Sequence, residues 1–407
     1  MQILIIGGGA SGMMAALTAA EDPHNQITLL ERQNRVGKKL LATGNGRCNL
    51  SNLNASAVHY HGADARFVSG ILRKFDVAHT LEFFRNLGLY TVTEEDGKVY
   101  PLSDQANSVV DVLRFALEQK GVRVVTSCDV LSIRKKARGH QVETTGESYY
   151  GDKVIITCGG AAGKNLGGTR SGYNLLSMLG HSCTDLHPSL VQIKTDTRLI
   201  ASLKGVRADC AMTLKEDGHF VAQSTGEIQF TDFGVSGPIS FALSRSVSTG
   251  EGEMILLLDF LRNYDESQVQ AQLRERCNRF PDLGAEQLLT GMLNTRLGQA
   301  VLKFSQVEFS TPLKELTEEV LQKIAHNLKF FPLTVTGTLG MEHAQVTVGG
   351  VPAEEFRADT LESRIAPGIF AAGEVLNVDG DCGGFNLQWA WSSGHVAGKL
   401  GKIEENS

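Results

Sequence analysis

Apolar residues form short runs in the first part of the chain, and the first run opens directly into glycines. Ile3–Ile6 has the length of a buried strand, Gly7–Gly12 follows it, and residues 13–20 favour a helix. A short apolar run, a glycine turn and a helix together predict the start of a parallel α/β sheet. A second strand is predicted at residues 27–30, and it ends at Glu31.

The apolar pattern changes near His187 and changes back near Val346. The first part favours helices and buried strands, whereas the middle part alternates apolar and polar residues, as antiparallel strands do. The last part returns to a short buried strand and a final helix that ends near Leu400. Further predicted elements are helices at 67–88, 108–120, 266–279, 286–304 and 316–328, strands at 122–127, 153–157, 206–214, 227–231 and 368–372, and a turn at 234–238.

This order predicts a discontinuous α/β fold. A Rossmann-like nucleotide-binding domain would be built from residues 1–188 and completed by residues 343–407. Residues 189–342 would form a domain of mixed type inserted between these two parts. Because the chain is long enough for two or three domains, each part has ample residues to bury a core.

Gly7, Gly9 and Gly12 have the spacing of a dinucleotide fingerprint. The first glycine permits a tight turn, the second lets the backbone approach a pyrophosphate, and the third lets the helix pack close to the strand. The phosphates would lie at the positive end of that helix. Glu31, nineteen residues after Gly12, is placed to bind the adenosine ribose and disfavours a 2′-phosphate there. The alternative is a glycine-rich turn in an ordinary α/β protein.

Composition narrows the class of protein. The 407 residues carry a formal net charge of -6 at pH 7, which disfavours strong sequence-independent binding to nucleic acid. No apolar stretch reaches the ~18 residues of a membrane span, and the chain starts directly with a strand, so we expect neither a span nor a signal peptide. The seven cysteines form no CxxC pair and no zinc spacing, which predicts no metal site and a reducing cytoplasm.

Three further segments are rich in glycine and lie outside the regular elements. Residues 40–52 contain Gly44, Gly46 and Asn49 and are predicted to form an irregular loop whose amides face a ligand. The strand at 153–157 is followed, after Cys158, by two glycines. The segment 373–387 contains a carboxylate and a glycine-rich helix start. These segments resemble the successive FAD-contacting elements of two-dinucleotide-domain flavoproteins.

That resemblance implies a set of FAD-binding residues. The carboxylate of Glu374 would hold the ribityl chain, and the amides that begin the final helix would lie at the N1/O2 edge of the flavin. The residues assigned to FAD are Gly7, Gly9, Ala10, Ser11, Gly12, Glu31, Arg32, Gly44, Gly46, Asn49, Val130, Gly159, Gly160, Gly373, Glu374, Gly384, Phe385, Asn386 and Leu387.

The similarity extends over essentially the whole chain to one family, the BaiN/RdsA flavoproteins. Its signatures are carried by residues 44–49, 234–238, 373–376 and 388–393. The family implies an FAD domain with an inserted β-barrel and a small helical piece. It also implies reduction of a double bond conjugated to a carbonyl, in either 3-oxo-Δ4,6 bile acids or a uridine of ribosomal RNA.

Three functions follow from this resemblance. The favoured one is an ene-reductase of 3-oxo-Δ4,6 bile-acid intermediates, an oxidoreductase that acts on CH–CH groups and takes a small steroid enone as its partner. The alternative is a 23S ribosomal RNA dihydrouridine synthase, which needs a basic surface with aromatic residues near the flavin. A flavin-bearing sensor or binding protein ranks last. Because a second nucleotide fingerprint is missing, NAD(P)H is expected to reach the flavin transiently.

Two residues of the 40–52 loop are predicted to be catalytic. Arg47 would polarise the enone oxygen, and Cys48 would supply the proton. The alternatives are a phosphate or loop contact for Arg47 and a small packing residue for Cys48. Further candidates for proton donation or orientation are Tyr100, His187 and Ser236, whereas Asp379 and Asp381 are expected to be solvated loop carboxylates.

Overall fold

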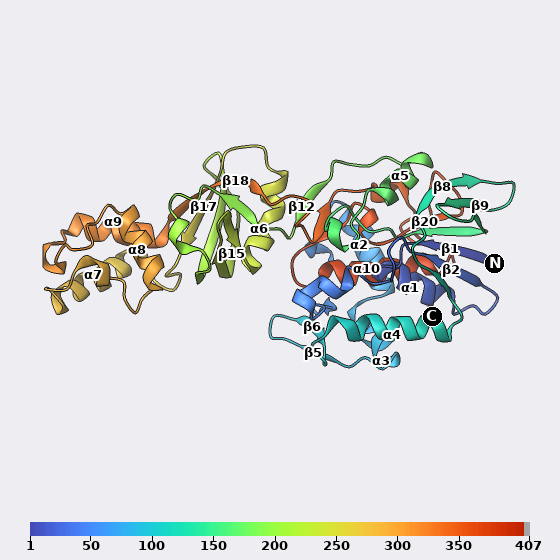
Figure 1. Cartoon of the computed structure of the whole chain (residues 1–407), viewed down its shortest axis with the longest axis horizontal. Coiled ribbons are helices and arrows are strands. Elements are labelled where there is room, and N and C mark those ends of the chain that lie inside the picture. Colours follow the sequence, from blue (N-terminus) through green and yellow to red (C-terminus); the bar gives the residue numbers. More distant parts are fainter. Residues whose placement is uncertain (403–407) are drawn as a thin grey trace. The chain divides into compact units, whose positions relative to one another are not determined.

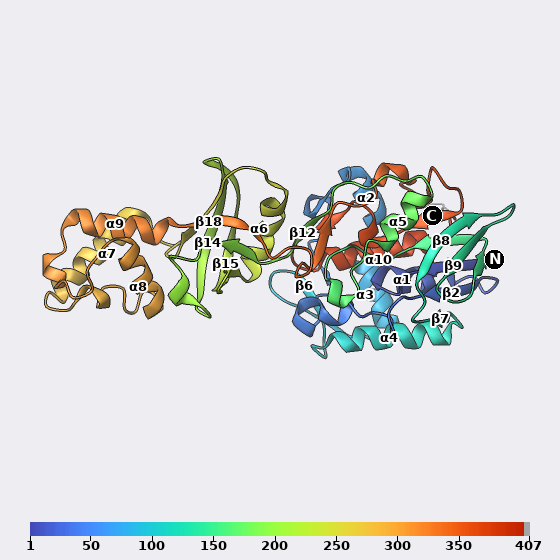
Figure 2. The same cartoon turned by 45° about the horizontal axis from the view of Figure 1, so that its top comes forward.

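The computed structural model describes residues 1–402, and these form two compact units. The first unit comprises Met1–His187 and the chain from Gln345 onward, and the second comprises Pro188–Ala344. The predicted divisions after residues 188 and 342 lie within two residues of these limits. Figure 1 shows both units with the chain coloured from its N-terminus to its C-terminus, and Figure 2 shows them turned by 45°.

A five-stranded parallel sheet lies at the centre of the first unit, in the order β20-β11-β1-β2-β7. Its strands are covered on both faces and are therefore rich in Ile, Leu and Val. Ile5 of β1 pairs with Leu29 on one side and Ile155 on the other, and all three are fully buried. The strands are β1 (Gln2–Ile6), β2 (Gln26–Leu30), β7 (Arg123–Val125), β11 (Lys153–Ile156) and β20 (Ile369–Ala371).

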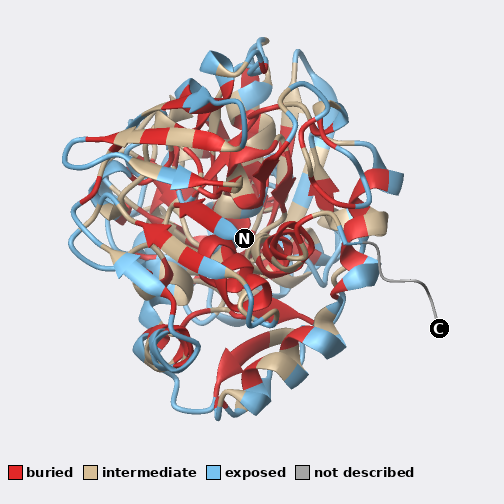
Figure 3. Cartoon of the chain, turned by 90° about the vertical axis from the view of Figure 1, so that its right-hand side faces the viewer, coloured by how far each residue is buried: buried red, intermediate tan, exposed pale blue. Residues whose placement is uncertain are grey.

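Two buried helices pack closely against each other, and the first of them also contacts β1, β2 and β11 of this sheet. These are α1 (Ala10–Ala19) and α10 (Phe385–Gly398), which come from opposite ends of the chain. A Cβ on Gly394 would lie 2.5 Å from the carbonyl oxygen of Ser11, and one on Gly398 would lie 2.7 Å from that of Ala15. The two glycines of α10 therefore permit this close approach. Figure 3 shows the buried residues gathered along the inner strands and helices of this unit.

The other elements of the first unit surround the central sheet. The helices are α2 (Ala65–Lys74), α3 (Val77–Asn86), α4 (Ala106–Gln119) and α5 (Ser171–Met178). The strands of the small sheets are β3 (Ser51–Asn52), β4 (Tyr60–His61), β5 (Thr91–Thr93), β6 (Lys98–Pro101), β8 (Val130–Lys135), β9 (His140–Thr144), β10 (Tyr149–Gly151), β19 (Val346–Val348) and β21 (Asp379–Gly380). One more strand, β12 (His187–Ser189), spans the division after His187.

The second unit is a closed six-stranded barrel with helices, which confirms the predicted β-barrel and helical insert. The barrel order is β13-β16-β15-β14-β17-β18. Its strands are β13 (Ile193–Thr195), β14 (Arg207–Glu216), β15 (His219–Phe230), β16 (Gly234–Ser236), β17 (Met254–Asp259) and β18 (Phe331–Thr338). Its helices are α6 (Pro238–Thr249), α7 (Glu266–Arg279), α8 (Thr295–Phe304) and α9 (Glu318–Lys329).

Three predicted elements differ from the structure. The predicted helix at 67–88 is two helices, because Asp76 caps α3 by accepting a hydrogen bond of 3.0 Å from the amide of His79. The predicted helix at 286–304 is an α-helix only from Thr295, because Asn294 caps α8, and a short 3-10 helix at Ala285–Gln287 precedes it. The predicted turn at 234–238 contains β16, a strand of the barrel, and α6 then begins at Pro238.

Within residues 1–402, no helix combines the length and the apolar character needed to cross a membrane.

Candidate active site

Four of the predicted cofactor-binding segments begin where parallel strands of the central sheet end. The glycine loop follows β1, Glu31 follows β2, Gly159 lies just after β11, and Gly373 lies just after β20. The carboxyl ends of parallel strands lie at one edge of a sheet, and the strand order here reverses at β1, where ligands of such folds bind. The sheet therefore brings these four segments together at a single edge.

The glycines of the fingerprint loop have different surroundings. A Cβ on Gly7 would lie 2.5 Å from the carbonyl oxygen of Thr157, and one on Gly12 would lie 1.9 Å from that of Gly7. A Cβ on Gly9 would meet no atom of the described residues within 4 Å, and its φ of -81° suits any residue. Contacts within the protein therefore explain why residues 7 and 12 are glycines, whereas Gly9 faces open space at the start of α1.

Helix α1 begins at this open space without a side-chain cap. Ala10, Ser11 and Gly12 form its first turn, where backbone amides have no intrahelical partner. The first turn of α1 contains no acidic residue. Uncapped amides, the positive end of a helix and a glycine with space in front of it make a cradle for a phosphate group.

Glu31 lies directly beside the fingerprint loop. Its Oε2 accepts a hydrogen bond of 2.6 Å from the amide of Gly8, and its Oε1 accepts one of 2.6 Å from the amide of Gln33. Arg32 is exposed and donates a hydrogen bond of 3.1 Å to the carbonyl oxygen of Gly167. Val130 is buried at the start of β8. Two residues before it, the amide of Cys128 donates a hydrogen bond to the carbonyl oxygen of Glu31.

Glu374 forms an ion pair with a lysine from the opposite end of the first unit's sequence. Its Oε2 lies 2.8 Å from Nζ of Lys39, and its Oε1 accepts a hydrogen bond of 2.8 Å from the amide of Thr347. Oε1 also lies 2.5 Å from the Cβ position of Gly160, where a side chain would collide with the carboxylate. The carboxylate is therefore held at the sheet edge, beside the second glycine that follows β11.

Helix α10 begins much as α1 does. Gly384, at φ 98°, precedes it without a side-chain cap, so the amides of Phe385, Asn386 and Leu387 begin the helix. The side chain of Asn386 binds both backbone groups of Gly380, at 2.8 and 2.7 Å. The Asn386 side chain thus anchors the preceding loop, while its amide remains part of the positive helix end.

The loop that contains the predicted catalytic residues is tightly wound. Gly44, Asn45, Gly46 and Cys48 all have positive φ, between 55° and 86°. Asn49, with its amide oriented to suit both neighbours, donates to the carbonyl oxygen of Ser51 and accepts from the amide of Gly384 at 3.1 Å. Asn49 therefore connects this loop to the start of α10.

Arg47 is surrounded by groups that favour its charge. Its Nε binds Asp104, its Nη2 lies 2.9 Å from Glu94, and its guanidinium carbon lies 3.9 Å from the centre of the Tyr100 ring. The hydrogen bonds to Asp104 and Glu94 raise the pKa of Arg47 above its already high ordinary value. Within residues 1–402, Nη1 of Arg47 has no hydrogen-bond partner, so it can still donate to a bound anion.

Cys48 has the opposite environment. Its side chain is 0 % exposed, and burial raises the pKa of its thiol to about 12, against the weaker opposing effect of a hydrogen bond with Thr43. The role of Cys48 as a proton donor stays a prediction, but these surroundings favour the alternative role of a small packing residue.

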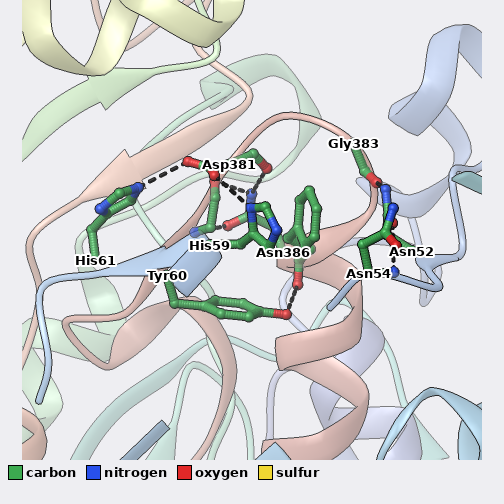
Figure 4. Close-up of polar contacts among 10 residues, drawn as sticks. Asn52, Asn54, His59, Tyr60, His61, Asp381, Gly383 and Asn386 are labelled. Carbon is green, nitrogen blue, oxygen red and sulfur yellow. Dashed lines mark hydrogen bonds and ion pairs between the residues drawn. The ribbon is translucent and has the colours of Figure 1, made fainter. Parts of the chain in front are cut away.

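The structure brings together a polar cluster that the sequence did not indicate. His59 Nδ1 lies 3.0 Å from Oδ2 of Asp381, and His61 Nε2 lies 2.9 Å from its Oδ1. Figure 4 shows both histidines turned toward this one carboxylate, with Asn386 and Tyr60 beside it. Burial opposes the charge of Asp381, but the hydrogen bonds from His61 and His59 outweigh it and lower the pKa of the carboxyl. Asp381 is thus paired although 44% of its side chain is exposed, whereas Asp379 is 1 % exposed, so the expectation of a solvated carboxylate is wrong for Asp379.

Of the remaining candidates, Tyr100 lies beside the predicted catalytic loop and contacts Arg47. His187 begins β12, and Ser236 belongs to the barrel of the second unit. A cavity of about 560 Å³ adjoins α4, but its lining includes none of the predicted site residues. Across residues 1–402, no group of three or more His, Cys, Asp or Glu side chains is arranged to hold a metal ion.

These features fit a dinucleotide. Open space lies in front of Gly9, one uncapped helix end could receive phosphate and another an anionic ring edge, and the carboxylates of Glu31 and Glu374 could accept hydrogen bonds from hydroxyls. Donors for phosphate and acceptors for sugar hydroxyls are the two kinds of group that a dinucleotide needs. Sheet order and site together define a Rossmann-class nucleotide-binding protein.

The chain belongs to the HI0933-like family, whose Rossmann-domain model matches residues 1–400. It is 40% identical over 402 residues to a 3-dehydro-bile acid delta(4,6)-reductase of Clostridium scindens, covering 98% of both chains. It is 28% identical over 393 residues to a ribosomal RNA dihydrouridine synthase of Escherichia coli, covering 96% of this chain and 95% of that one. The resemblance inferred from the sequence motifs is confirmed, and the chain is an oxidoreductase.

A solved structure of the open conformation of a flavocytochrome c3 fumarate reductase shares the fold. Its TM-score is 0.51 at 15% identity, and the match covers 98% of this chain and 77% of that one. The predicted fold class, a Rossmann-like domain with an inserted barrel, is therefore confirmed.

Proposed function

We propose that this protein is an FAD-dependent reductase of a carbon–carbon double bond conjugated to a carbonyl, and that its substrate is a 3-oxo-Δ4,6 bile-acid intermediate. The observation that carries the proposal is the 40% identity, over nearly the full length of both chains, to the bile-acid reductase. NAD(P)H is the proposed source of hydride. The proposed place of action is the cytoplasm.

The residues proposed to hold FAD fall into groups, each of which would contact a different part of the FAD molecule. The first turn of α1 would bind the pyrophosphate, Glu31 the adenosine ribose, and Glu374 the ribityl chain. The first amides of α10 would stabilise negative charge on the flavin ring. When bound, FAD supplies a hydride carrier between NAD(P)H and the substrate.

The protein's own contribution to the chemistry is charge stabilisation and proton delivery. Addition of hydride to a conjugated enone moves an electron pair onto the carbonyl oxygen, and the resulting enolate needs a hydrogen-bond donor. Arg47 is the proposed donor, because Asp104 and Glu94 hold its guanidinium in place while Nη1 stays available. Carbon protonation then completes the reduction.

The second candidate is a ribosomal RNA dihydrouridine synthase. The 28% identity to the Escherichia coli enzyme, over 95% of that protein, favours it. Uridine also carries a double bond conjugated to a carbonyl, so the same charge stabilisation and proton delivery would serve. The acidic net charge of -6 weighs against a polyanionic substrate.

Turnover with each candidate substrate tests the proposal. Purified protein is incubated anaerobically with NADH or NADPH and a 3-oxo-4,6-dienoic bile acid, and the product is analysed by mass spectrometry. We expect a product with two added hydrogens and no conversion of uridine in ribosomal RNA. Dihydrouridine formation without steroid reduction would contradict the substrate assignment and favour the second candidate.

Glu31→Ala is expected to weaken FAD binding about 5- to 150-fold, since the ribose hydroxyls would lose a charged acceptor worth roughly 1–3 kcal/mol. Titration of the apoprotein with FAD, followed by flavin fluorescence, measures this change. Glu82→Ala, at an exposed position of α3, is the matched control and should bind FAD like the wild type. Equal affinities for Glu31→Ala and the wild type would remove Glu31 from the site.

A further inference from the structure

The two histidines around Asp381 have an arrangement suited to proton transfer. One oxygen of the carboxylate pairs with Nδ1 of His59 and the other with Nε2 of His61. Within residues 1–402, the second ring nitrogen of each histidine has no hydrogen-bond partner. A carboxylate that binds one nitrogen of an imidazole fixes the tautomer and leaves the other nitrogen to exchange a proton.

This cluster is built into the beginning of α10. β21 and β4 pair antiparallel, and the amide of Asp381 donates a hydrogen bond of 2.9 Å to the carbonyl oxygen of His59. The ring of His59 stacks on that of Phe385, the first residue of α10, with 4.3 Å between ring centres. Asn386, the second residue, binds the carbonyl oxygen of Asp381 at 3.3 Å. The cluster therefore has a defined position beside the helix end assigned above to the flavin ring.

The cluster is also accessible. The side chains of His59 and His61 are 32% and 35% exposed, and that of Asp381 is 44% exposed. A proton donor must reach both the substrate and the solvent that restores its proton. Cys48, fully enclosed, meets neither requirement.

We propose that His59, Asp381 and His61 form the proton relay of the reduction, with His59 as the catalytic acid; this rests on the proposed function. After hydride addition, the N–H bond at Nε2 of protonated His59 breaks, a C–H bond forms at the α-carbon, and the enolate electrons return to form the carbonyl. Asp381 positions His59 through Nδ1, and His61 binds the other oxygen of the carboxylate and keeps it oriented. Water restores the proton of His59, so no further reactant is needed.

Rapid mixing measures flavin reoxidation, the half-reaction in which the relay would act, separately from flavin reduction. The FAD-loaded protein is reduced with NAD(P)H, and the reduced protein is then mixed anaerobically with the 3-oxo-4,6-dienoic bile acid. We expect His59→Ala to slow flavin reoxidation on the order of 10²-fold, with FAD content and the rate of flavin reduction unchanged. Added imidazole should restore part of the rate. Asp381→Asn should also slow reoxidation, and Asp381→Glu should slow it less.

His79→Ala is the matched control, because His79 also pairs through Nδ1 with an aspartate, Asp76 at 2.8 Å, but lies on α3. It should reoxidise like the wild type. A His59→Ala protein that reoxidises at the wild-type rate would overturn the relay, while leaving the proposed function intact. A wild type that the dienone does not reoxidise would instead contradict the proposed function itself.

A second readout does not depend on activity. Nitrogen NMR of the histidine rings in the FAD-loaded protein should show protonated Nδ1 on His59 and protonated Nε2 on His61 when the rings are neutral. Asp381→Asn should change the ring signals of both histidines together, whereas Asp76→Asn should leave them unchanged. Independent behaviour of the two rings would contradict a shared carboxylate relay.

Discussion

Gly9→Val is expected to yield a folded protein without bound FAD. A side chain at residue 9 would enter the open space at the start of α1, where the pyrophosphate is proposed to lie, and it would meet no described atom of the protein within 4 Å. We expect the dissociation constant for FAD to rise by at least about 100-fold, equivalent to roughly 2.7 kcal/mol. The flavin absorbance of the purified protein and a fluorescence titration of its apoprotein measure this loss.

Gly12→Val provides the contrast. A Cβ at residue 12 would lie 1.9 Å from the carbonyl oxygen of Gly7, so this variant should lose stability as well as FAD. Circular dichroism during heating distinguishes the two variants, since only Gly9→Val should unfold near the temperature of the wild-type apoprotein. If Gly9→Val bound FAD as tightly as the wild type, the fingerprint loop would be a structural turn only.

Arg47→Ala is expected to slow reoxidation of the reduced flavin by the dienone about 10²- to 10³-fold, with flavin reduction by NAD(P)H little changed. The reason is that the variant lacks the charged donor proposed to stabilise the oxygen on which negative charge develops. Rapid mixing measures the two half-reactions separately. Arg85→Ala, on α3, is the control and should change neither rate. Equal slowing of both half-reactions by Arg47→Ala would assign Arg47 to the binding of FAD.

Cys48→Ala tests the neighbouring residue in the same assay. Because its thiol is fully buried and its pKa is raised to about 12, we expect reoxidation to stay within about threefold of the wild-type rate. Cys48→Ser should behave in the same way. A loss on the order of 10²-fold in both variants would restore Cys48 as the proton donor and would contradict its role as a packing residue.

The fold could be predicted largely from local patterns. Ile3–Ile6 and the glycines after it are adjacent in the sequence, so their strand, turn and helix follow from short-range rules. The break inside the predicted 67–88 helix could have been predicted, because Asp76 is a residue type that favours helix N-caps and it begins α3. The strand at Gly234–Ser236 could not be predicted, because only Val235 of its three residues is apolar and so short a segment shows no alternation; pairing within the closed barrel makes it a strand.

The candidate site was predictable only where each segment carries its own motif. Gly9 and Glu31 belong to such a motif, and the sheet edge brings them together as expected. His59 and His61 have the spacing of residues on one face of a strand, which was a usable signal. Their partner Asp381 lies more than 300 positions away, and no local rule connects them. The ion pair of Lys39 with Glu374 could not be predicted either, because these residues are also far apart in the sequence.

One comparison tests the central proposal, that the substrate of this oxidoreductase is a steroid enone. The FAD-loaded protein is reduced anaerobically, and the reoxidation of its flavin is followed after mixing with a 3-oxo-4,6-dienoic bile acid or with a uridine-containing fragment of 23S ribosomal RNA. The account predicts rapid reoxidation by the bile acid, with one reduced steroid formed per flavin, and none by the RNA. Rapid reoxidation by the RNA, with dihydrouridine formed and the bile acid unchanged, would contradict it.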